Sequence, residues 1–128
     1  MGKTLIDTNV VIDFLNRKLP RAGWKYISDE LKKGVHLSAI TKIELLGYKV
    51  EQHDEAILKS FISGSILLPV ADDVIEKAIW VCKQGSIKTP DAIIAATALV
   101  YNLNFVSRNT KDFKHIKGLQ IINPWILT

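Results

Sequence analysis

The sequence predicts an α/β fold: one three-layer α/β/α domain over residues 1–128, with a mostly parallel sheet of about five strands. Three observations lead to this prediction. The chain has 128 residues, the size of one domain with a single core. Its candidate strands are short and uniformly apolar, as in sheets buried on both faces. Helical stretches separate those strands, which is the pattern of parallel strands joined by helical crossovers.

The first strand is predicted at Leu5-Ile6. A helix follows over 8–16, because Thr and Asn open it and an apolar helical pattern continues behind them. Pro20 then marks a basic turn. A second helix is expected over 22–33, where apolar residues recur three and four apart, and Gly34 is its candidate C-cap.

The middle of the chain continues this alternation with a short strand at 35–38. Thr41 is expected to open a helix over 41–50, with one apolar face formed by Ile43, Leu46 and Val50. Another helix is expected over 53–63, and a third strand over 66–70. Asp72 or Asp73 should cap the helix after that strand, which ends at the Gly-containing stretch 84–86.

The last third begins at Thr89-Pro90-Asp91, which has Thr as N-cap, Pro at the first helical position and an acid beside it. The helix body, 92–100, is apolar all round, so we expect it to be buried. Strands are predicted at 105–107 and 119–122, with a short helix ending near Lys117 between them.

Composition excludes several classes of protein. Hydrophobic residues make up 48% of the chain and charged residues 23%, which is typical of globular proteins. No apolar run approaches the roughly 18–20 residues of a membrane span, and the start Met1-Gly2-Lys3 opens no signal peptide because Asp7 interrupts the apolar stretch. We therefore expect a cytoplasmic protein without a membrane partner. One cysteine, Cys82, excludes an internal disulfide, and three scattered histidines give no zinc-type cluster.

The charge balance favours an anionic partner. The chain carries 17 basic and 13 acidic residues, a net charge of +4. If four of the acids serve one metal site, the rest of the chain is more basic still. A basic body around an acidic pocket suits an enzyme that holds a polyphosphate backbone and acts on it through cations.

Four acids, Asp7, Glu44, Asp91 and Asp112, each lie at or just inside a predicted helix start. Taken alone, each acid could simply stabilise a helix N-terminus. Glu44 also has the capping-box spacing from Thr41. Taken together they indicate a site. The carboxyl ends of parallel strands share one edge of a sheet, so acids there come close together.

Carboxylates gathered in this way repel one another, and a divalent cation reverses that penalty. Oxygen ligands without His or Cys suit a hard ion, Mg²⁺ or Mn²⁺. Such an ion lowers the pKa of a bound water and neutralises charge that develops on a phosphate. Four polar side chains are candidates to orient the carboxylates or waters: Thr8, Asn9, Ser107 and Asn109.

Basic residues close to these acids have two open interpretations, as phosphate contacts or as a solvated basic face. They are Lys42, Arg108 and Lys111. Asp13 lies six residues after Asp7, almost two helical turns on, and is expected to point away from the site.

Four blocks of sequence carry a family resemblance: Asp7-Thr8-Asn9, Ser38 to Gly47, Thr89 to Ala98, and Ser107 to Phe113. In this order and spacing they resemble the signature blocks of PIN-domain proteins. More narrowly, they resemble the VapC-like ribonuclease toxins of prokaryotic type II toxin–antitoxin pairs.

The resemblance implies a Mg²⁺- or Mn²⁺-dependent endoribonuclease whose metal-binding and catalytic acids are Asp7, Glu44, Asp91 and Asp112. In some relatives the residue matching Asn109 is also acidic, so this chain has one fewer negative charge there. The resemblance further implies a homodimer, an RNA substrate and a small antitoxin protein whose tail enters the active-site groove.

Two other functions stay open. The first is a catalytically weak PIN domain that acts as an RNA-binding or protein-binding module. The second is phosphotransfer, because an acid after the first strand also occurs in aspartyl-phosphate phosphatases. Those enzymes have an Asp-x-Asp pattern, however, and in this chain Asn9 occupies the third position of that pattern. No Gly-rich phosphate loop supports binding of a nucleoside triphosphate.

Overall fold

A computed structural model describes residues 3–128 of the chain. Met1 and Gly2 lie outside the described residues; they belong to the start of the chain, where we expect no signal peptide. Five strands form one sheet in the order β3-β2-β1-β4-β5, and every pair in it is parallel. The strands are β1 (Thr4–Ile6), β2 (His36–Ser38), β3 (Ile66–Leu68), β4 (Asn104–Val106) and β5 (Ile121–Ile122). The predicted α/β fold with a parallel sheet is confirmed.

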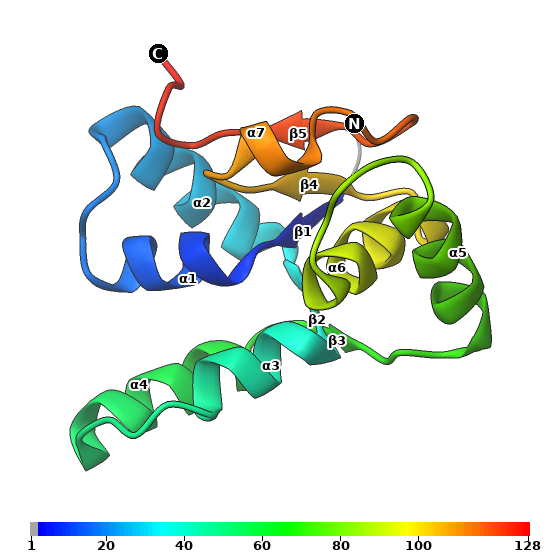
Figure 1. The fold of residues 1–128 in the computed structure, drawn as a ribbon. Helices are drawn as coiled ribbons and strands as arrows, with labels where there is room; N and C mark the ends of the chain where they lie inside the picture. Colours follow the sequence, from blue (N-terminus) through cyan, green and yellow to red (C-terminus); the bar gives the residue numbers. More distant parts are fainter. Residues whose placement is uncertain (1–2) are drawn as a thin grey trace.

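Helices cover both faces of the sheet (Figure 1). They are α1 (Thr8–Leu15), α2 (Arg21–Lys33), α3 (Ala39–Leu46), α4 (Gln52–Ser63), α5 (Asp72–Cys82), α6 (Thr89–Val100) and α7 (Thr110–Phe113). In Figure 1, α3 and α4 lie side by side and extend away from the sheet, while α5 packs against α6. Over residues 3–128, no helix is long and apolar enough to cross a membrane.

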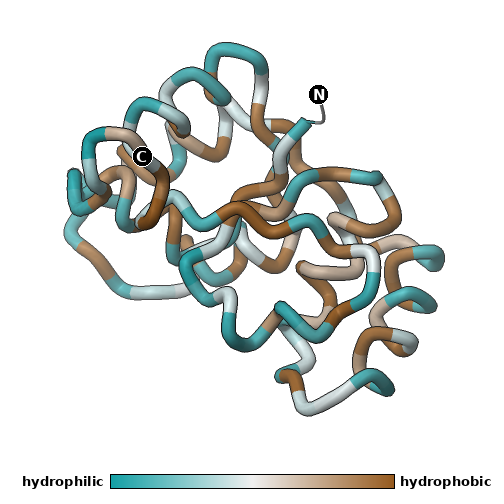
Figure 2. The backbone as a smooth tube through the Cα atoms, turned by 90° about the horizontal axis from the view of Figure 1, so that it is seen from above, coloured by the Kyte–Doolittle hydropathy of each residue, from teal (hydrophilic) through white to brown (hydrophobic). Residues whose placement is uncertain are grey.

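The core divides between the two faces of the sheet. Successive residues of a strand point to opposite faces, and the central strand β1 shows this directly. Leu5 packs in the cluster that includes the apolar residues of α5 and α6, whereas Ile6 packs with those of α1, α2 and α4. Phe105 and Val106 of β4 divide in the same way. Figure 2 shows hydrophobic segments of the chain in the interior and hydrophilic turns around them.

Helix α6 is buried, as its uniformly apolar sequence predicted. Ala92, Ala95, Ala96 and Ala98 are each almost fully inaccessible to solvent. Small side chains allow neighbouring elements to approach closely, and α6 packs against both α5 and α3. This burial fixes the start of α6, and therefore Asp91, relative to the sheet.

The apolar face predicted for the third helix is wrong. The helix begins two residues earlier than expected, because the Ser38 hydroxyl accepts a hydrogen bond from the Ile40 N–H at 3.1 Å and caps it. It ends at Gly47, so the pattern that continued to Val50 runs past its end. Ile43 is 65% exposed and Val50 is also exposed, whereas Leu45 is buried and Leu46 is partly buried against the core.

Smaller differences concern the caps of α5 and α6. Ala71 is the N-cap of α5, and Asp73 instead accepts a hydrogen bond from the next backbone N–H at 2.8 Å. Lys88 is the N-cap of α6, which makes Thr89 its first helical residue. The predicted C-cap at Gly34 has φ of 95°, a conformation that favours glycine.

The strand order places a topological switch point at the centre of the sheet. From β1 the chain moves outward to β2 and β3, and then returns to the other side as β4 and β5. In open α/β sheets, ligands bind at the carboxyl ends of the strands where the order reverses. Asp7 follows β1 and Ser107 follows β4 directly, so both lie at that point.

Substitution of Gly23 tests how tightly α2 packs against the C-terminal segment. A Cβ there would overlap the carbonyl oxygen of Pro124. We expect Gly23→Ala to lower the free energy of unfolding by about 1–3 kcal/mol, measured by urea denaturation, because backbone would have to move. Gly64→Ala is the control, since its Cβ would meet carbonyl oxygens at 3.6 and 3.7 Å, ordinary contact distances. Equal stability of the two variants would contradict this packing.

Candidate active site

A hollow of about 220 Å³ lies at the carboxyl ends of the central strands. Three of the four predicted acids line it: Asp7 after β1, Glu44 on α3 and Asp91 in the first turn of α6. Its other lining residues are Thr8, Asn9, Ile12, Tyr48 and Asn109. We call this site the acidic hollow. The fold therefore brings together acids that are far apart in the sequence.

Asp7 is almost fully buried, with 4% of its surface exposed, and protein groups bind both of its carboxylate oxygens. The Thr8 backbone N–H donates to Oδ1 at 2.8 Å. Asn9 Nδ2 and Ser107 Oγ donate to Oδ2 at 3.0 and 2.8 Å. These three bonds fix the orientation of the carboxylate. They also leave a lone pair of Oδ1 free for a further ligand.

The pKa of Asp7 is raised from 3.8 to about 6. Burial is the main cause, and the neighbouring charges of Asp91 and Glu44 add to it, against hydrogen bonds from Ser107 and the Thr8 N–H that lower it. A helix N-terminus by itself lowers the pKa of an acid, so burial outweighs that effect at Asp7. Asp7 caps α1, but its surroundings disfavour its charged form. A bound cation would favour that form.

Glu44 is tied to α1 rather than to the start of its own helix. Thr8 Oγ1 donates a hydrogen bond to Glu44 Oε1 at 2.6 Å, and the Thr41 hydroxyl lies 3.2 Å from the same Thr8 oxygen. Thr41 is inside α3, and Ser38 provides the cap. The capping-box explanation for Glu44 is therefore wrong.

Asp91 also has a raised pKa. Burial is the largest cause, followed by the charges of Glu44 and Asp112, while Lys88 acts in the opposite direction. Asp91 is thus close enough to both acids for their charges to repel one another. Proline in the first turn of α6 fixes the backbone from which Asp91 extends.

Asp112 is placed differently from the other three acids. It is exposed and lies outside the lining of the acidic hollow, although its charge acts on Asp91. Its Oδ2 accepts a hydrogen bond from Asn109 Nδ2 at 2.8 Å. Asn109 itself lines the hollow. Asp112 therefore orients the Asn109 side chain.

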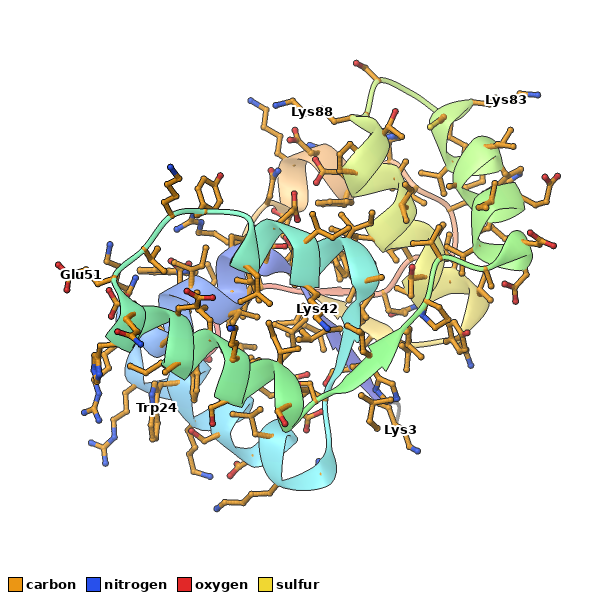
Figure 3. All side chains as sticks on the ribbon, turned by 90° about the horizontal axis from the view of Figure 1, so that it is seen from below. Lys3, Trp24, Lys42, Glu51, Lys83 and Lys88 are labelled. Atoms are coloured by element: carbon orange, nitrogen blue, oxygen red, sulfur yellow. The ribbon has the colours of Figure 1, made fainter. Side chains whose placement is uncertain are left out.

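The candidate phosphate contacts lie outside the acidic hollow. Lys42, labelled in Figure 3, is exposed and starts from α3 about 200° around the helix from Glu44. Lys111 is exposed on α7. Arg108 is bound to Asp13, with its Nη1 3.1 Å from Asp13 Oδ2. As predicted, Asp13 does not line the hollow.

Three residues near the acids were not predicted from the sequence. Ile12 and Tyr48 line the hollow, and Lys88 lowers the pKa of Asp91. Ile12 lies four residues, or one helical turn, after Thr8 on α1, and Tyr48 lies four residues after Glu44, just past the end of α3. That spacing is a signal by which both could have been found.

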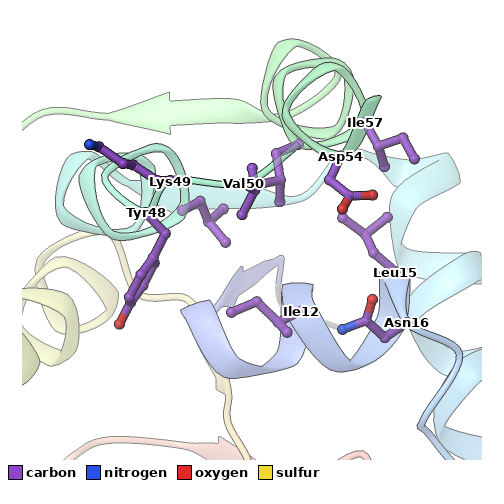
Figure 4. Close-up of a pocket in the computed structure, with 10 residues that line it drawn as sticks. Ile12, Leu15, Asn16, Tyr48, Lys49, Val50, Asp54 and Ile57 are labelled. Carbon is purple, nitrogen blue, oxygen red and sulfur yellow. The ribbon is translucent and has the colours of Figure 1, made fainter. Parts of the chain in front are cut away.

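A second, larger hollow of about 430 Å³ adjoins the first and shares Ile12 and Tyr48 with it. We call it the apolar hollow. Figure 4 shows Ile12 and Leu15 of α1 opposite Val50 after α3 and Ile57 of α4. Ten residues line this hollow. They are Ile12, Leu15, Asn16, Leu45, Tyr48, Lys49, Val50, Asp54, Ile57 and Leu58.

The donor atoms of the acidic hollow fit a hard divalent ion. Within residues 3–128, no three His, Cys, Asp or Glu side chains are close enough to enclose an ion by themselves. Mg²⁺ suits such a site because it keeps several waters and needs only one or two direct carboxylates. Burial and, to a smaller extent, neighbouring carboxylates raise the pKa of Asp7 and of Asp91, so a bound cation would favour the charged form of both groups. Asp7, Glu44 and Asp91 are the side chains that would hold the ion.

Comparison with known proteins gives the family. The family model described as the PIN domain matches residues 4–119. The chain belongs to the PIN-domain family. The matched range contains all four predicted acids of this PIN domain and every strand before β5.

Curated relatives of this PIN domain are similar over nearly their whole length. The chain is 27% identical to VapC ribonuclease Y4jK of Sinorhizobium fredii, with 94% of this chain and 96% of that protein aligned. It is 28% identical to ribonuclease VapC1 of Methanocaldococcus jannaschii, with 94% and 87% aligned. Among solved structures, a toxin–antitoxin complex from Klebsiella pneumoniae contains a similar chain at 29% identity, with a TM-score of 0.77 and 97% and 99% of the two chains covered.

The raised pKa of Asp7 predicts how stability depends on pH without metal. The unfolded chain releases this proton near pH 4, whereas the folded protein holds it to about pH 6. The associated stability is complete below pH 4 and is lost as the pH rises through 6. We expect Asp7 to lower the free energy of unfolding in chelator by about 3 kcal/mol across this range.

Urea unfolding of wild type and Asp7→Asn between pH 4 and pH 7 measures this effect. The variant has no titratable group at this position, so it should lack this loss of stability between pH 4 and pH 7. The slopes are compared rather than the absolute stabilities, because Asn adds an N–H beside Asn9 Nδ2. Parallel profiles for the two proteins would contradict the raised pKa.

Proposed function

We propose that this PIN domain is a Mg²⁺- or Mn²⁺-dependent endoribonuclease that hydrolyses RNA phosphodiester bonds, and that it is the toxin of a toxin–antitoxin pair. One observation carries the proposal: Asp7, Glu44 and Asp91 line one hollow at the switch point of the sheet, and the pKa values of Asp7 and Asp91 are raised there. The names of the curated VapC ribonucleases support the same activity.

We propose distinct roles for the residues of the site. Asp7, Glu44 and Asp91 hold the ion, with Asp112 as the fourth acid beside Asp91. Thr8 fixes Glu44, while Asn9 and Ser107 fix Asp7. Asn109 presents its amide to the hollow. A divalent ion bound there would lower the pKa of an attacking water and neutralise charge that develops on the phosphate.

The basic surface suits the proposed substrate. The chain as a whole has a net charge of +4 although the site is acidic. Lys88 lies beside Asp91, and Lys42, Arg108 and Lys111 are exposed on nearby elements. Cations on such a surface attract a nucleic-acid backbone by contacts that do not depend on sequence. We assign RNA rather than DNA because the curated relatives are named ribonucleases.

A small antitoxin protein is the second proposed partner. The similar Klebsiella pneumoniae chain comes from a toxin–antitoxin complex. The apolar hollow beside the acids suits apolar side chains of a peptide that would also cover the site. We further propose that the protein is cytoplasmic and forms a homodimer. Exposed apolar residues support the homodimer: Ile75, Ile79 and Trp80 on α5, and Ile43 on α3.

Asp91→Asn tests the proposed activity. It should reduce Mn²⁺-dependent cleavage of RNA on the order of a hundredfold or more, because the amide removes a negative charge from the ion site. Asp72→Asn is a matched control, since Asp72 is also an acid in the first turn of a helix. Both variants lose the same type of helix-dipole interaction, about 0.3–1 kcal/mol, so both should stay folded.

Gel analysis of total RNA with Mn²⁺ or with chelator is the readout. Full activity of Asp91→Asn, or undiminished cleavage in chelator, would overturn the proposed site. Absence of cleavage by metal-loaded wild type would favour the alternative function, a PIN domain that binds RNA or protein without cutting.

The antitoxin proposal is tested by Ile57→Glu in the apolar hollow. Ile57 is 40% exposed on α4, so the variant should fold and keep its nuclease activity. A charge there should prevent co-purification with the proposed antitoxin, sought as the product of a small reading frame next to the gene for this chain, because apolar contacts would be lost. Ile126→Glu, at an exposed position outside the hollow, is the control. Unchanged co-purification of Ile57→Glu would place the antitoxin elsewhere.

A further inference from the structure

Asp13 is the centre of a hydrogen-bonded cluster that the proposed nuclease site does not contain. The residue lies on α1 and is only 4% exposed. Trp125 Nε1 donates to its Oδ2 at 2.8 Å. Arg108 Nη1 donates to Oδ2 at 3.1 Å and approaches Oδ1 at 3.4 Å. One buried carboxylate thus joins α1, the segment between β4 and α7, and the C-terminal segment.

The cluster is connected to Asp7 through the residues beside Arg108. The Arg108 backbone N–H donates to Asn9 Oδ1 at 3.2 Å, and Asn9 Nδ2 donates to Asp7. On the other side, Ser107 Oγ donates to Asp7 and accepts the Asn109 N–H at 3.0 Å. Every residue of the segment 107–109 therefore bonds to Asp7 directly or through one intermediate side chain.

We propose that Asp13 is a positioning residue for the divalent-ion site. By holding the Arg108 side chain, it fixes the segment 107–109 against Asp7 and so sets the affinity of the acidic hollow for the ion. This inference rests on the proposed function. It gives Arg108 a structural task in the site in addition to any contact with RNA.

The Asp13 pair adds a side-chain anchor for Arg108 to a segment that backbone bonds also hold, such as the Ser107 N–H to the Ile122 carbonyl at 3.0 Å. The segment lies between β4 and α7, and Asn109 makes no side-chain cap for the short helix that follows. The carboxylates in the hollow repel one another, which favours outward movement of the groups that bind them. A buried carboxylate that is paired and hydrogen-bonded has one defined geometry, and its loss leaves the segment free to shift.

The alternative is that Asp13 and Arg108 act on the site only through their charges. The direction in which the affinity for Mn²⁺ changes separates this alternative from the positioning role. Arg108→Ala removes a positive charge, which by electrostatics alone should strengthen binding of Mn²⁺. Loss of positioning should weaken it instead. Lys111→Ala removes the same charge from the neighbouring helix α7 without touching the cluster, so it is the matched control.

Calorimetric titration of the full, metal-free chain with Mn²⁺ is the experiment, at a temperature well below unfolding of each variant. We expect Asp13→Asn and Arg108→Ala to raise the Kd for Mn²⁺ about tenfold, and Lys111→Ala to leave it unchanged or lower it. Trp125→Phe alters no charge but removes one hydrogen bond to Asp13, so it should raise the Kd by a smaller factor.

The outcomes are distinct. If Asp13→Asn does not fold, the comparison of Arg108→Ala with Lys111→Ala still decides. Equal or tighter Mn²⁺ binding by Arg108→Ala, together with unchanged binding by Trp125→Phe, would overturn the positioning role of Asp13. Wild type that binds no Mn²⁺ would instead overturn the proposed function of the site.

Discussion

Repulsion between partly buried carboxylates is the constraint on which the rest of this structure depends. Asp7, Glu44 and Asp91 share one hollow, and burial together with their mutual charge raises the pKa of Asp7 to about 6. The fold holds them there because each is attached to an element fixed by its own packing: the central strand, α3 against α4, and the buried helix α6. Packing energy elsewhere in the domain offsets the strain at the site.

Hydrogen bonds fix the orientation of the carboxylates in this cluster. Asp7 is bound on both oxygens, and the residues that bind it lead through Asn9 and Arg108 to the buried carboxylate of Asp13. Glu44 is fixed by Thr8 from the same helix start. These bonds join α1 to the segments that follow β2 and β4. The geometry of the hollow therefore depends also on residues that contribute no atom to it.

The sequence was sufficient for the fold and for the grouping of three acids, because both follow from regular features. Short apolar strands with helical crossovers place residues such as Asp7 at one sheet edge. The apolar face of α3 was wrongly predicted: Gly47 ends the helix before Val50, and inside the helix Leu45 rather than Ile43 faces the core. The Asp13–Arg108 pair was missed because it depends on how far side chains reach across a loop. The ligand roles of the acids stay predictions.

Anomalous diffraction from crystals of the full chain soaked in Mn²⁺ tests the central claim most directly, that these carboxylates are gathered to hold a divalent ion. The account predicts a manganese peak inside the acidic hollow, with at least one oxygen of Asp7, Glu44 or Asp91 at about 2.0–2.2 Å, the range of carboxylate oxygens on Mg²⁺ and Zn²⁺, and waters completing the shell. A hollow without a peak at saturating Mn²⁺, with the three acids bonded only to protein groups and water, would contradict it.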